Sequence, residues 1–512
     1  MVKIRDFALM LEIGKMDGAE KCEVVGSIVS LEEEINLLQA KGYWWRPGGN
    51  VKASGEVVFS HGEEGASLRL FGYPDETKDF EGFVRGCVHP ARHIALLKCL
   101  EHQGQTNLAC GLGTETAELN FIEMWAGDLG FESVEEIAFE SYAFGISNLN
   151  VWLNRGCFSP RDGKSKHVEL HRLMFEDAFV RVYLALLPVQ SVMEGVNRRT
   201  IRHEPCVFIK SKNGMLPYYG ETGCYEYYEH RLTSFFGLLI GKNAAHYGRC
   251  GRADYPLSET AKAAGVVWRL NRRPLPRRLL TPLKREDIFV PYEAIEKELP
   301  RIIENYFRLS DEIDGICGRL VYFRFGQTAI PYGGVPGLVF MFEGLSRNLY
   351  DEDLNLKREQ MPGYQVHKAN MEKVSAMLES EPELMKWLSK RLKFRPPKIQ
   401  ELFDWARLCM KDAFLYLDND NAWLAYTNYL RARRDGFAHS ESKALMHDKM
   451  YMPAYFWLEG FMMGMVLLKC GVPPEIIRRG VSGCSDFRWG ITTYYEEFIK
   501  DNAGRYGHYE HT

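Results

Sequence analysis

The chain lacks the cysteine patterns of a disulfide-bonded secreted domain and of a structural zinc site. Its 12 cysteines are scattered over 512 residues, and no two of them form a CxxC pair. Scattered thiols of this kind are typical of proteins from a reducing compartment. The first residues carry acids early and contain no long apolar run, so we expect no secretory signal. These absences favour a cytoplasmic protein.

The chain also lacks a large excess of either charge. Its formal net charge is -4, which excludes a protein that coats nucleic acid through its overall charge. Any site for a polyanion must therefore be a local cluster of basic side chains. The sequence contains no internal repeat and no low-complexity tract. Because 512 residues are too many for one core, we expect several domains.

One segment, residues 452–468, has the composition of a membrane span. It is about 17 residues long, at the short edge of spanning length, and Glu459 lies in its middle. We therefore expect a buried helix and no membrane partner. Its methionines suit an adaptable packing surface such as a subunit interface. The GxxxG spacing of Gly460 and Gly464 carries little weight outside a membrane.

Two groups of Cys and His residues have spacings that could begin a metal site: Cys87, His89 and His93 in one, and His167 and His171 in the other. Neither group has a second cluster to complete a set of four ligands. The glutamate between the last two histidines stands in the wrong place for a zinc protease. The glycine-rich residues 111–116 lack the lysine of a phosphate-binding loop. We therefore expect no metal and no cofactor.

Changes of pattern along the chain divide it into parts. Residues 1–165 read as a β-rich N-terminal domain, residues 166–270 as a second part with mixed α/β signals, residues 271–289 as a connector rich in proline and arginine, and residues 290–512 as a helical domain. The prolines of the connector forbid a continuous helix. The predicted fold class is α+β multidomain, with a sandwich-like or barrel-like β region followed by an all-α bundle.

Local patterns predict individual elements within these parts. β-prone runs predict strands at residues 55–60, 66–72, 117–125, 137–144 and 206–210. Apolar residues at helical spacing predict helices at residues 225–242, 292–309, 338–350, 371–392, 398–417 and 422–433 and near 492–500. Trp44 and Trp45 could stack on a base or a sugar. Packing in a core is favoured, because large aromatic side chains dominate core burial.

The segment from Arg434 to His439, RDGFAH, carries the most specific chemistry. An arginine can hold a phosphate at neutral pH, and a histidine titrates near neutrality. On a straight helix an offset of five residues would separate the two side chains by about 140°. Because Gly436 weakens the helix between them, we predict a loop-to-helix junction with Arg434 in the loop and His439 in the first turn. Asp435 is placed to orient one of them through a charge-assisted hydrogen bond.

Further basic side chains flank this segment: Arg431, Arg433, Lys443 and His447. They could form a local funnel for RNA, or they could be solvated charges on helix surfaces. The arginines of the connector leave the same two interpretations open.

The segment and its context resemble the HEPN superfamily of helical ribonucleases. The signature of that superfamily is an arginine, four to six residues and then a histidine, often with a polar residue directly after the arginine. Arg434, Asp435 and His439 match it. The N-terminal half resembles the N-terminal domain of ApeA-type proteins at residues 42–47 (GYWWRP), 55–59, 68–72, 137–141 and 149–152.

The resemblance implies a bacterial abortive-infection protein that acts against phage and waits for a phage trigger. HEPN nucleases use no metal: the 2′-hydroxyl of the RNA attacks the adjacent phosphate. In this chain His439 would be the general base or acid, Arg434 would stabilise the charge on the phosphate, and Asp435 would orient one of them. One motif supplies one histidine, so the family pairs two domains across a twofold interface. The implied partners are a second copy of the chain, in a homodimer or a higher even-numbered oligomer, and host RNA such as tRNA.

Two other functions stay open from the sequence. A HEPN domain without catalysis could be a scaffold that binds RNA or a protein. Alternatively, the β region could be a carbohydrate- or peptide-binding module that the helices dimerise.

Overall fold

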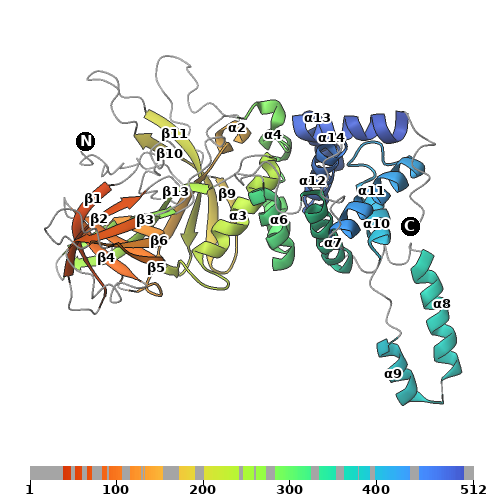
Figure 1. Ribbon diagram of the computed structural model, residues 1–512, viewed down its shortest axis with the longest axis horizontal. Coiled ribbons are helices and arrows are strands. Elements are labelled where there is room, and N and C mark those ends of the chain that lie inside the picture. Colours follow the sequence, from red (N-terminus) through yellow and green to blue (C-terminus); the bar gives the residue numbers. More distant parts are fainter. Residues whose placement is uncertain are drawn as a thin grey trace, which may run out of the picture. The chain divides into compact units, whose positions relative to one another are not determined.

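A computed structural model divides the chain into two compact units, Met1–Arg285 (the β unit) and Glu286–Thr512 (the helical unit) (Figure 1). Antiparallel β structure makes up the first, and a largely helical region of about ten helices makes up the second. The predicted fold class is therefore confirmed. The structure describes residues 39–47, 52–59, 66–71, 83–88, 92–105, 116–127, 131, 133–153, 172–190, 201–241, 246–258, 261–271, 283–323, 334–352, 362–378, 380–391, 398–438 and 449–500.

Within its described residues, the β unit contains mostly long strands and two helices. Its strands are β1 (Gln39–Trp45), β2 (Lys52–Phe59), β3 (Ala66–Phe71), β4 (Val84–Val88), β5 (Arg92–Gln105), β6 (Thr116–Gly127), β7 (Ala138–Phe139), β8 (Ser141–Ile146), β9 (Arg172–Glu176), β10 (Val180–Gln190), β11 (Ile201–Ser211), β12 (Leu216–Pro217), β13 (His246–Ser258) and β14 (Ala261–Asn271). Its helices are α2 (Leu149–Leu153) and α3 (Tyr225–Ile240).

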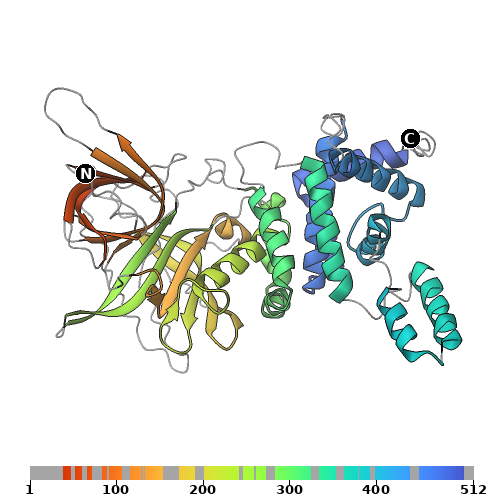
Figure 2. The same cartoon turned by 60° about the horizontal axis from the view of Figure 1, so that its bottom comes forward.

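The first six strands close into an antiparallel barrel. Hydrogen-bonded neighbours follow the order β3-β2-β1-β4-β5-β6, and β6 also pairs with β3, which completes the ring (Figure 2). The closing register runs from Ala66 opposite Phe121 to Phe71 opposite Thr116. From Glu123 onward, β6 pairs with β14 instead. One long strand therefore belongs to the barrel at one end and to an open sheet at the other.

The open sheet continues from β6 in the order β14-β13-β8-β11-β10-β9. The strands of residues 166–270 therefore join the same sheet as those before them. Helix α3 is almost wholly buried and contacts β8 and α2. It ends at Gly241, whose φ of 81° is the left-handed conformation that closes many helices.

The barrel interior is built around Trp44. Its side chain is fully buried, and the neighbouring strands place Gly86 and Ala53 opposite it. A Cβ atom on Gly86 would lie 2.1 Å from the indole, so only glycine fits there. The core interpretation is therefore confirmed for Trp44. Trp45 lies on the other side of the barrel wall, because successive side chains of a strand alternate.

The helical unit starts with short elements and ends in a bundle. Its elements are η4 (Arg285–Asp287), α4 (Tyr292–Ile295), α5 (Leu299–Phe307), α6 (Asp311–Phe323), α7 (Gly334–Glu352), α8 (Pro362–Met377), α9 (Pro382–Arg391), α10 (Ile399–Met410), α11 (Asp420–Ala438), α12 (Tyr451–Lys469), α13 (Pro474–Gly483), α14 (Ser485–Tyr494) and η6 (Tyr495–Lys500). Three predicted helices were too long. Residues 292–309 are divided between α4 and α5, and residues 371–392 between α8 and α9. The helix predicted at residues 398–417 ends at Met410 as α10.

Helix α12 is the centre of the bundle and contacts α14, α7, α13, α10 and α6. Gly460 faces the ring of Phe487, and a Cβ atom on Gly464 would lie 2.7 Å from the side chain of Met410. The GxxxG spacing therefore lets neighbouring helices of the same chain come close. The predicted buried helix is confirmed.

The methionines of α12 do not form an exposed packing surface. Met462, Met463 and Met465 are all at most 4% exposed. The idea that they line a subunit interface is therefore wrong, because helices of the same chain already cover them. Within the described part of the chain, no helix combines the length and apolar character needed to cross a membrane.

Candidate functional site

Arg434 and Asp435 lie on α11, within its last turns. The predicted loop-to-helix junction is therefore wrong, because the helix continues through Gly436 to Ala438. A glycine inside a helix costs only about 1 kcal/mol relative to alanine. Burial of apolar side chains of α11, such as Trp423 and Leu430, outweighs that cost. Three predicted site residues lie outside the described residues: His439, Lys443 and His447.

The guanidinium of Arg434 is held between two carboxylates. Its Nη1 donates a hydrogen bond to Oδ1 of Asp435 at 2.9 Å, and its Nη2 donates to Oε2 of Glu343 at 2.8 Å. Glu343 comes from α7, and its other oxygen accepts a hydrogen bond from Arg347 at 2.7 Å. Each terminal nitrogen of an arginine carries two hydrogens, so a second N–H remains on each for a phosphate oxygen. The Arg434 side chain is 27% exposed, which leaves it accessible to a ligand.

An aromatic ring supports the guanidinium from one side. Cζ of Arg434 lies 5.2 Å from the ring centroid of Phe340, a cation–π distance. The Phe340 ring meets Phe437 of α11 at 6.4 Å between centroids. Phe340, Glu343 and Arg347 are three and four residues apart, so they share one face of α7. We call these three side chains the α7 cradle.

Asp435 and Glu343 keep Arg434 charged. Burial on its own lowers the pKa of the guanidinium. The hydrogen bond with Asp435 and the negative charge of Glu343 outweigh burial, and the pKa is raised above its ordinary value. A cation that is fixed in place and carries directed N–H donors can bind a phosphate.

Two residues of the predicted funnel are described, Arg431 and Arg433, and their side chains lie on different faces of α11. Arg431 is three residues before Arg434 and shares its face. Its Nη1 lies 3.5 Å from Oδ1 of Asn428. Arg433 points about 100° away, where its guanidinium stacks 5.1 Å from the ring of Tyr429. The structure therefore brings Arg431 to the side of Arg434 and directs Arg433 elsewhere.

A hollow of about 360 Å³ between α10 and the start of α11 lies apart from these residues. Its cations face acids. Arg407 is 2.7 Å from Asp420, and Lys411 is 4.0 Å from Asp418. Balanced charges of this kind do not make a polyanion site.

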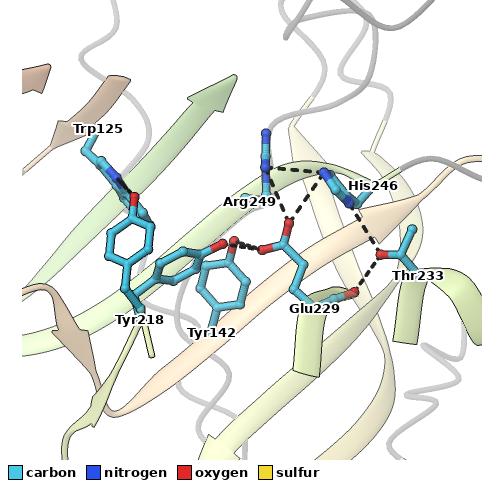
Figure 3. A network of polar contacts seen from close by, with 8 residues as sticks. Trp125, Tyr142, Tyr218, Glu229, Thr233, His246 and Arg249 are labelled. Atoms are coloured by element: carbon cyan, nitrogen blue, oxygen red, sulfur yellow. Dashed lines mark hydrogen bonds and ion pairs between the residues drawn. The ribbon is translucent and has the colours of Figure 1, made fainter. Parts of the chain in front are cut away.

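A second polar cluster lies inside the β unit, where α3 faces β8 and β13 (Figure 3). Its centre is Glu229, which is 3% exposed. One carboxylate oxygen accepts hydrogen bonds from Tyr142 at 2.5 Å and Tyr218 at 2.8 Å. The other oxygen lies 3.3 Å from Arg249 and 3.5 Å from His246. A buried ion pair needs such a set of partners to offset the cost of its desolvation.

The neighbouring Thr233 decides the tautomer of His246. The Thr233 hydroxyl donates to the backbone carbonyl of Glu229 at 2.7 Å, so it accepts from Nδ1 of His246 at 3.4 Å. The other ring nitrogen, Nε2, then accepts from Arg249 at 3.3 Å. Burial lowers the pKa of His246 to about 4, so the ring is neutral at physiological pH. The polar groups of this cluster form their hydrogen bonds and ion pairs with one another, which suits a structural role.

The candidate metal ligands form at most a pair in the described part of the chain. There, no group of three or more His, Cys, Asp or Glu side chains could hold a metal ion. Cys87 of β4 stands opposite His93 of β5 in the sheet register. The remaining candidates, His89, His167 and His171, lie outside the described residues.

Sequence reasoning missed the α7 cradle and the Glu229 cluster. Glu343 is 91 positions before Arg434, and Tyr142 is 87 positions before Glu229. No local spacing connects residues so far apart. The helical spacing of Phe340, Glu343 and Arg347 could have marked a shared face of α7, but it could not have identified Arg434 as the partner of that face.

Part of the β unit matches a known family of protein domains. Residues 39–176 match the family model described as ApeA N-terminal domain 1, which begins with β1 and ends with β9. No curated protein and no solved structure matches the chain. The resemblance of the N-terminal half is thereby confirmed. Residues 39–176 are therefore similar to ApeA N-terminal domain 1, and this similarity covers the part of the chain from β1 to β9.

Proposed function

We propose that the chain is a metal-independent endoribonuclease of the HEPN type, in which Arg434, Asp435 and His439 cleave RNA. The observation that carries this proposal is the way in which neighbouring side chains hold the guanidinium of Arg434. Two carboxylates and an aromatic ring hold its guanidinium in place near the end of α11, and it keeps N–H donors for a ligand. His439 follows α11 directly in the sequence, one residue after Ala438.

The proposed reaction needs one base and one acid. The base removes the proton of the 2′-hydroxyl, whose oxygen attacks the adjacent phosphorus. The bond to the 5′-oxygen of the next nucleotide breaks, and the acid protonates that oxygen. The products are a 2′,3′-cyclic phosphate and a 5′-hydroxyl end. A histidine has a reference pKa near 6.5 and can serve in either role. Arg434 would stabilise the negative charge that grows on the phosphate oxygens.

Glu343 serves in this proposal as a positioning residue. It fixes Nη2 of Arg434 and in turn is fixed by Arg347. Asp435 fixes Nη1 from the same helix. An arginine restrained at both terminal nitrogens loses little conformational freedom when a phosphate binds, and this restraint favours the transition state.

A second copy of the chain would supply the second histidine. Two aromatic side chains beside Arg434, Phe340 and Phe437, are each 39% exposed. Exposed aromatic side chains next to a charged site are typical of the centre of a protein interface. A twofold contact there would bring two copies of the motif to one RNA strand.

In a cell the proposed activity would serve abortive infection. A phage component would release the nuclease, and cleavage of host RNA such as tRNA would stop translation. The ApeA N-terminal domain 1 is the part of the chain through which we expect the trigger to act.

A metal-free cleavage assay tests the proposal. Wild type, Arg434→Ala and His439→Ala would be incubated with total cellular RNA in excess EDTA, with and without lysate of phage-infected cells. We expect wild type to leave 2′,3′-cyclic phosphate ends and both variants to leave none. An inactive wild type in every condition, combined with RNA binding, would identify a scaffold instead.

A further inference from the structure

The outer wall of the barrel carries aromatic side chains that no core explains. Tyr43 and Trp45 are two residues apart on β1 and lie on the side opposite to the buried Trp44. The side chain of Tyr43 is 64% exposed. This fraction is large for a tyrosine on β1, because β1 has a hydrogen-bonded strand on each side, β2 and β4. Its neighbours across the sheet are Ser54 and Cys87, which are too small to cover its ring.

Basic side chains surround these aromatic rings. The register places Lys52 of β2 and Arg85 of β4 on either side of Trp45. The amino group of Lys52 lies 5.4 Å from the Trp45 ring centroid, and the guanidinium carbon of Arg85 lies 5.9 Å from it. Lys41 is exposed two residues before Tyr43. We call Lys41, Tyr43, Trp45, Lys52 and Arg85 the barrel patch.

The charge of the barrel patch differs from that of the whole chain. Among the described residues of β1, β2 and β4, Glu56 is the only acid, and it stands opposite Lys41 in the sheet register. Arg46 adds a further exposed base directly after β1. The chain as a whole has a formal net charge of -4. Bases are therefore concentrated on this wall, and such a local concentration attracts a polyanion.

We propose that the barrel patch binds single-stranded nucleic acid. Lys41 and Lys52, which are exposed, would contact phosphates, and the exposed ring of Tyr43 would stack on an unpaired base. Arg85 is only 8% exposed and would support the Trp45 ring from within the wall. A base has a π-face whatever its identity, so an aromatic platform flanked by cations binds single strands with little sequence preference. A duplex hides its base faces and can use only the cations. This site is separate from the proposed nuclease site and does not depend on it.

Fluorescence anisotropy on the full chain tests the proposal. The probes are labelled 20-nucleotide oligo(dT), oligo(rU) and a mixed-sequence duplex, measured over a series of salt concentrations. All proteins carry Arg434→Ala, so that the proposed nuclease site neither binds strongly nor cleaves. We expect the single strands to bind more tightly than the duplex, with a slope of log affinity against log salt of about -1.4 for two neutralised phosphates.

Substitution of the aromatic side chain and of a basic side chain should change the binding of nucleic acid in different ways. Tyr43→Ala should weaken binding of single strands by roughly 5-fold or more and leave the salt slope unchanged. Lys52→Ala should weaken binding of single strands and duplex alike and reduce the slope by about 0.7. Matched controls are Phe179→Ala, which removes another exposed ring of the β unit, and Lys210→Ala, which removes another exposed base. Neither control should change binding.

Two results would overturn the proposal. One is the absence of single-strand binding at low salt up to about 100 μM protein, far above the range in which an aromatic and cationic platform binds. The other is equal binding by Tyr43→Ala and Phe179→Ala, because the exposed ring would then contribute nothing. A difference between oligo(dT) and oligo(rU) would identify which single strand the patch prefers.

Discussion

The α7 cradle and the Glu229 cluster both pair arginine with glutamate, but they differ in access to solvent. The Arg434 side chain is 27% exposed, whereas that of Arg249 is 2% exposed. A partly exposed ion pair can exchange water for a ligand while its fixed partners stay in place. A buried pair cannot be opened without leaving a charge uncompensated in a medium of low polarity. We therefore expect ligand binding at the first arrangement and stabilisation of the fold from the second.

The largest effect should come from removing the guanidinium of Arg434, and we expect it in the rate of RNA cleavage. We expect Arg434→Ala to lower the rate of RNA cleavage about 10³-fold, because a preorganised cation at the phosphate is lost. The melting temperature should change little, since the side chain is partly exposed. Rates of cyclic-phosphate formation and a thermal melt measure the two properties. Arg433→Ala, which removes the adjacent arginine stacked on Tyr429, is the control. Equal loss of activity in both variants would contradict a specific role for Arg434.

Breaking the buried arrangement should instead change stability. Glu229→Ala leaves Arg249 buried without its carboxylate and removes the acceptor of Tyr142 and Tyr218. We expect a loss of about 3–5 kcal/mol in the free energy of unfolding of the β unit. Denaturant unfolding followed by tryptophan fluorescence measures it. Glu221→Ala, an exposed acid of the same unit, should change the value by about 0.5 kcal/mol or less. A similar small change in both variants would remove the contrast between the two arrangements.

A smaller effect on catalysis should follow when only the position of Arg434 is disturbed. We expect Glu343→Ala to lower kcat about 10- to 100-fold, because a misplaced catalytic group costs up to about 10²-fold. Glu343→Gln can still accept a hydrogen bond and should recover part of that loss. The control is Glu304→Ala, which breaks an exposed ion pair with Arg308 far from the motif in the sequence. If glutamine and alanine have equal effects, positioning by a hydrogen bond is not the reason.

A last effect, which appears only below pH 6.5, concerns the dependence of stability on pH. The folded state holds the pKa of His246 at about 4, below its value of about 6.5 in an unfolded chain. The unfolded state therefore binds the extra proton first. This contribution to stability is fully present above pH 6.5 and is lost as the pH falls from 6.5 towards 4, by at most about 1.4 kcal/mol per pH unit. The charged and polar groups that face the ring are Glu229, Arg249, His230 and Thr233.

His246→Gln tests this contribution directly. Its stability should fall less steeply than that of wild type between pH 6.5 and 4, and the two slopes should agree above pH 7. Denaturant unfolding at each pH gives both slopes. Parallel slopes over the whole range would show that His246 is not the titrating group.

Much of the fold follows from local pattern. Runs of β-prone residues predicted the strands at residues 117–125 and 206–210, and these residues lie in β6 and β11. The apolar segment 452–468 predicted a buried helix, and α12 is that helix. The places where helices end were harder to predict. Gly436 suggested a break in α11, but burial of side chains elsewhere on that helix outweighs the weak propensity of one glycine.

By itself the sequence determined the order of a β region and a helical region, the buried apolar helix, and the resemblance of the N-terminal half to ApeA-type proteins. These depend on residue spacings of a few positions, which one sequence displays completely. Only the tertiary structure decided that β6 closes a barrel with β3, that Trp44 lies inside the barrel and Trp45 outside it, and that Glu343 holds Arg434. Each of these is a contact between residues far apart in the chain. Such contacts depend on the packing of whole elements, and no local spacing records that packing.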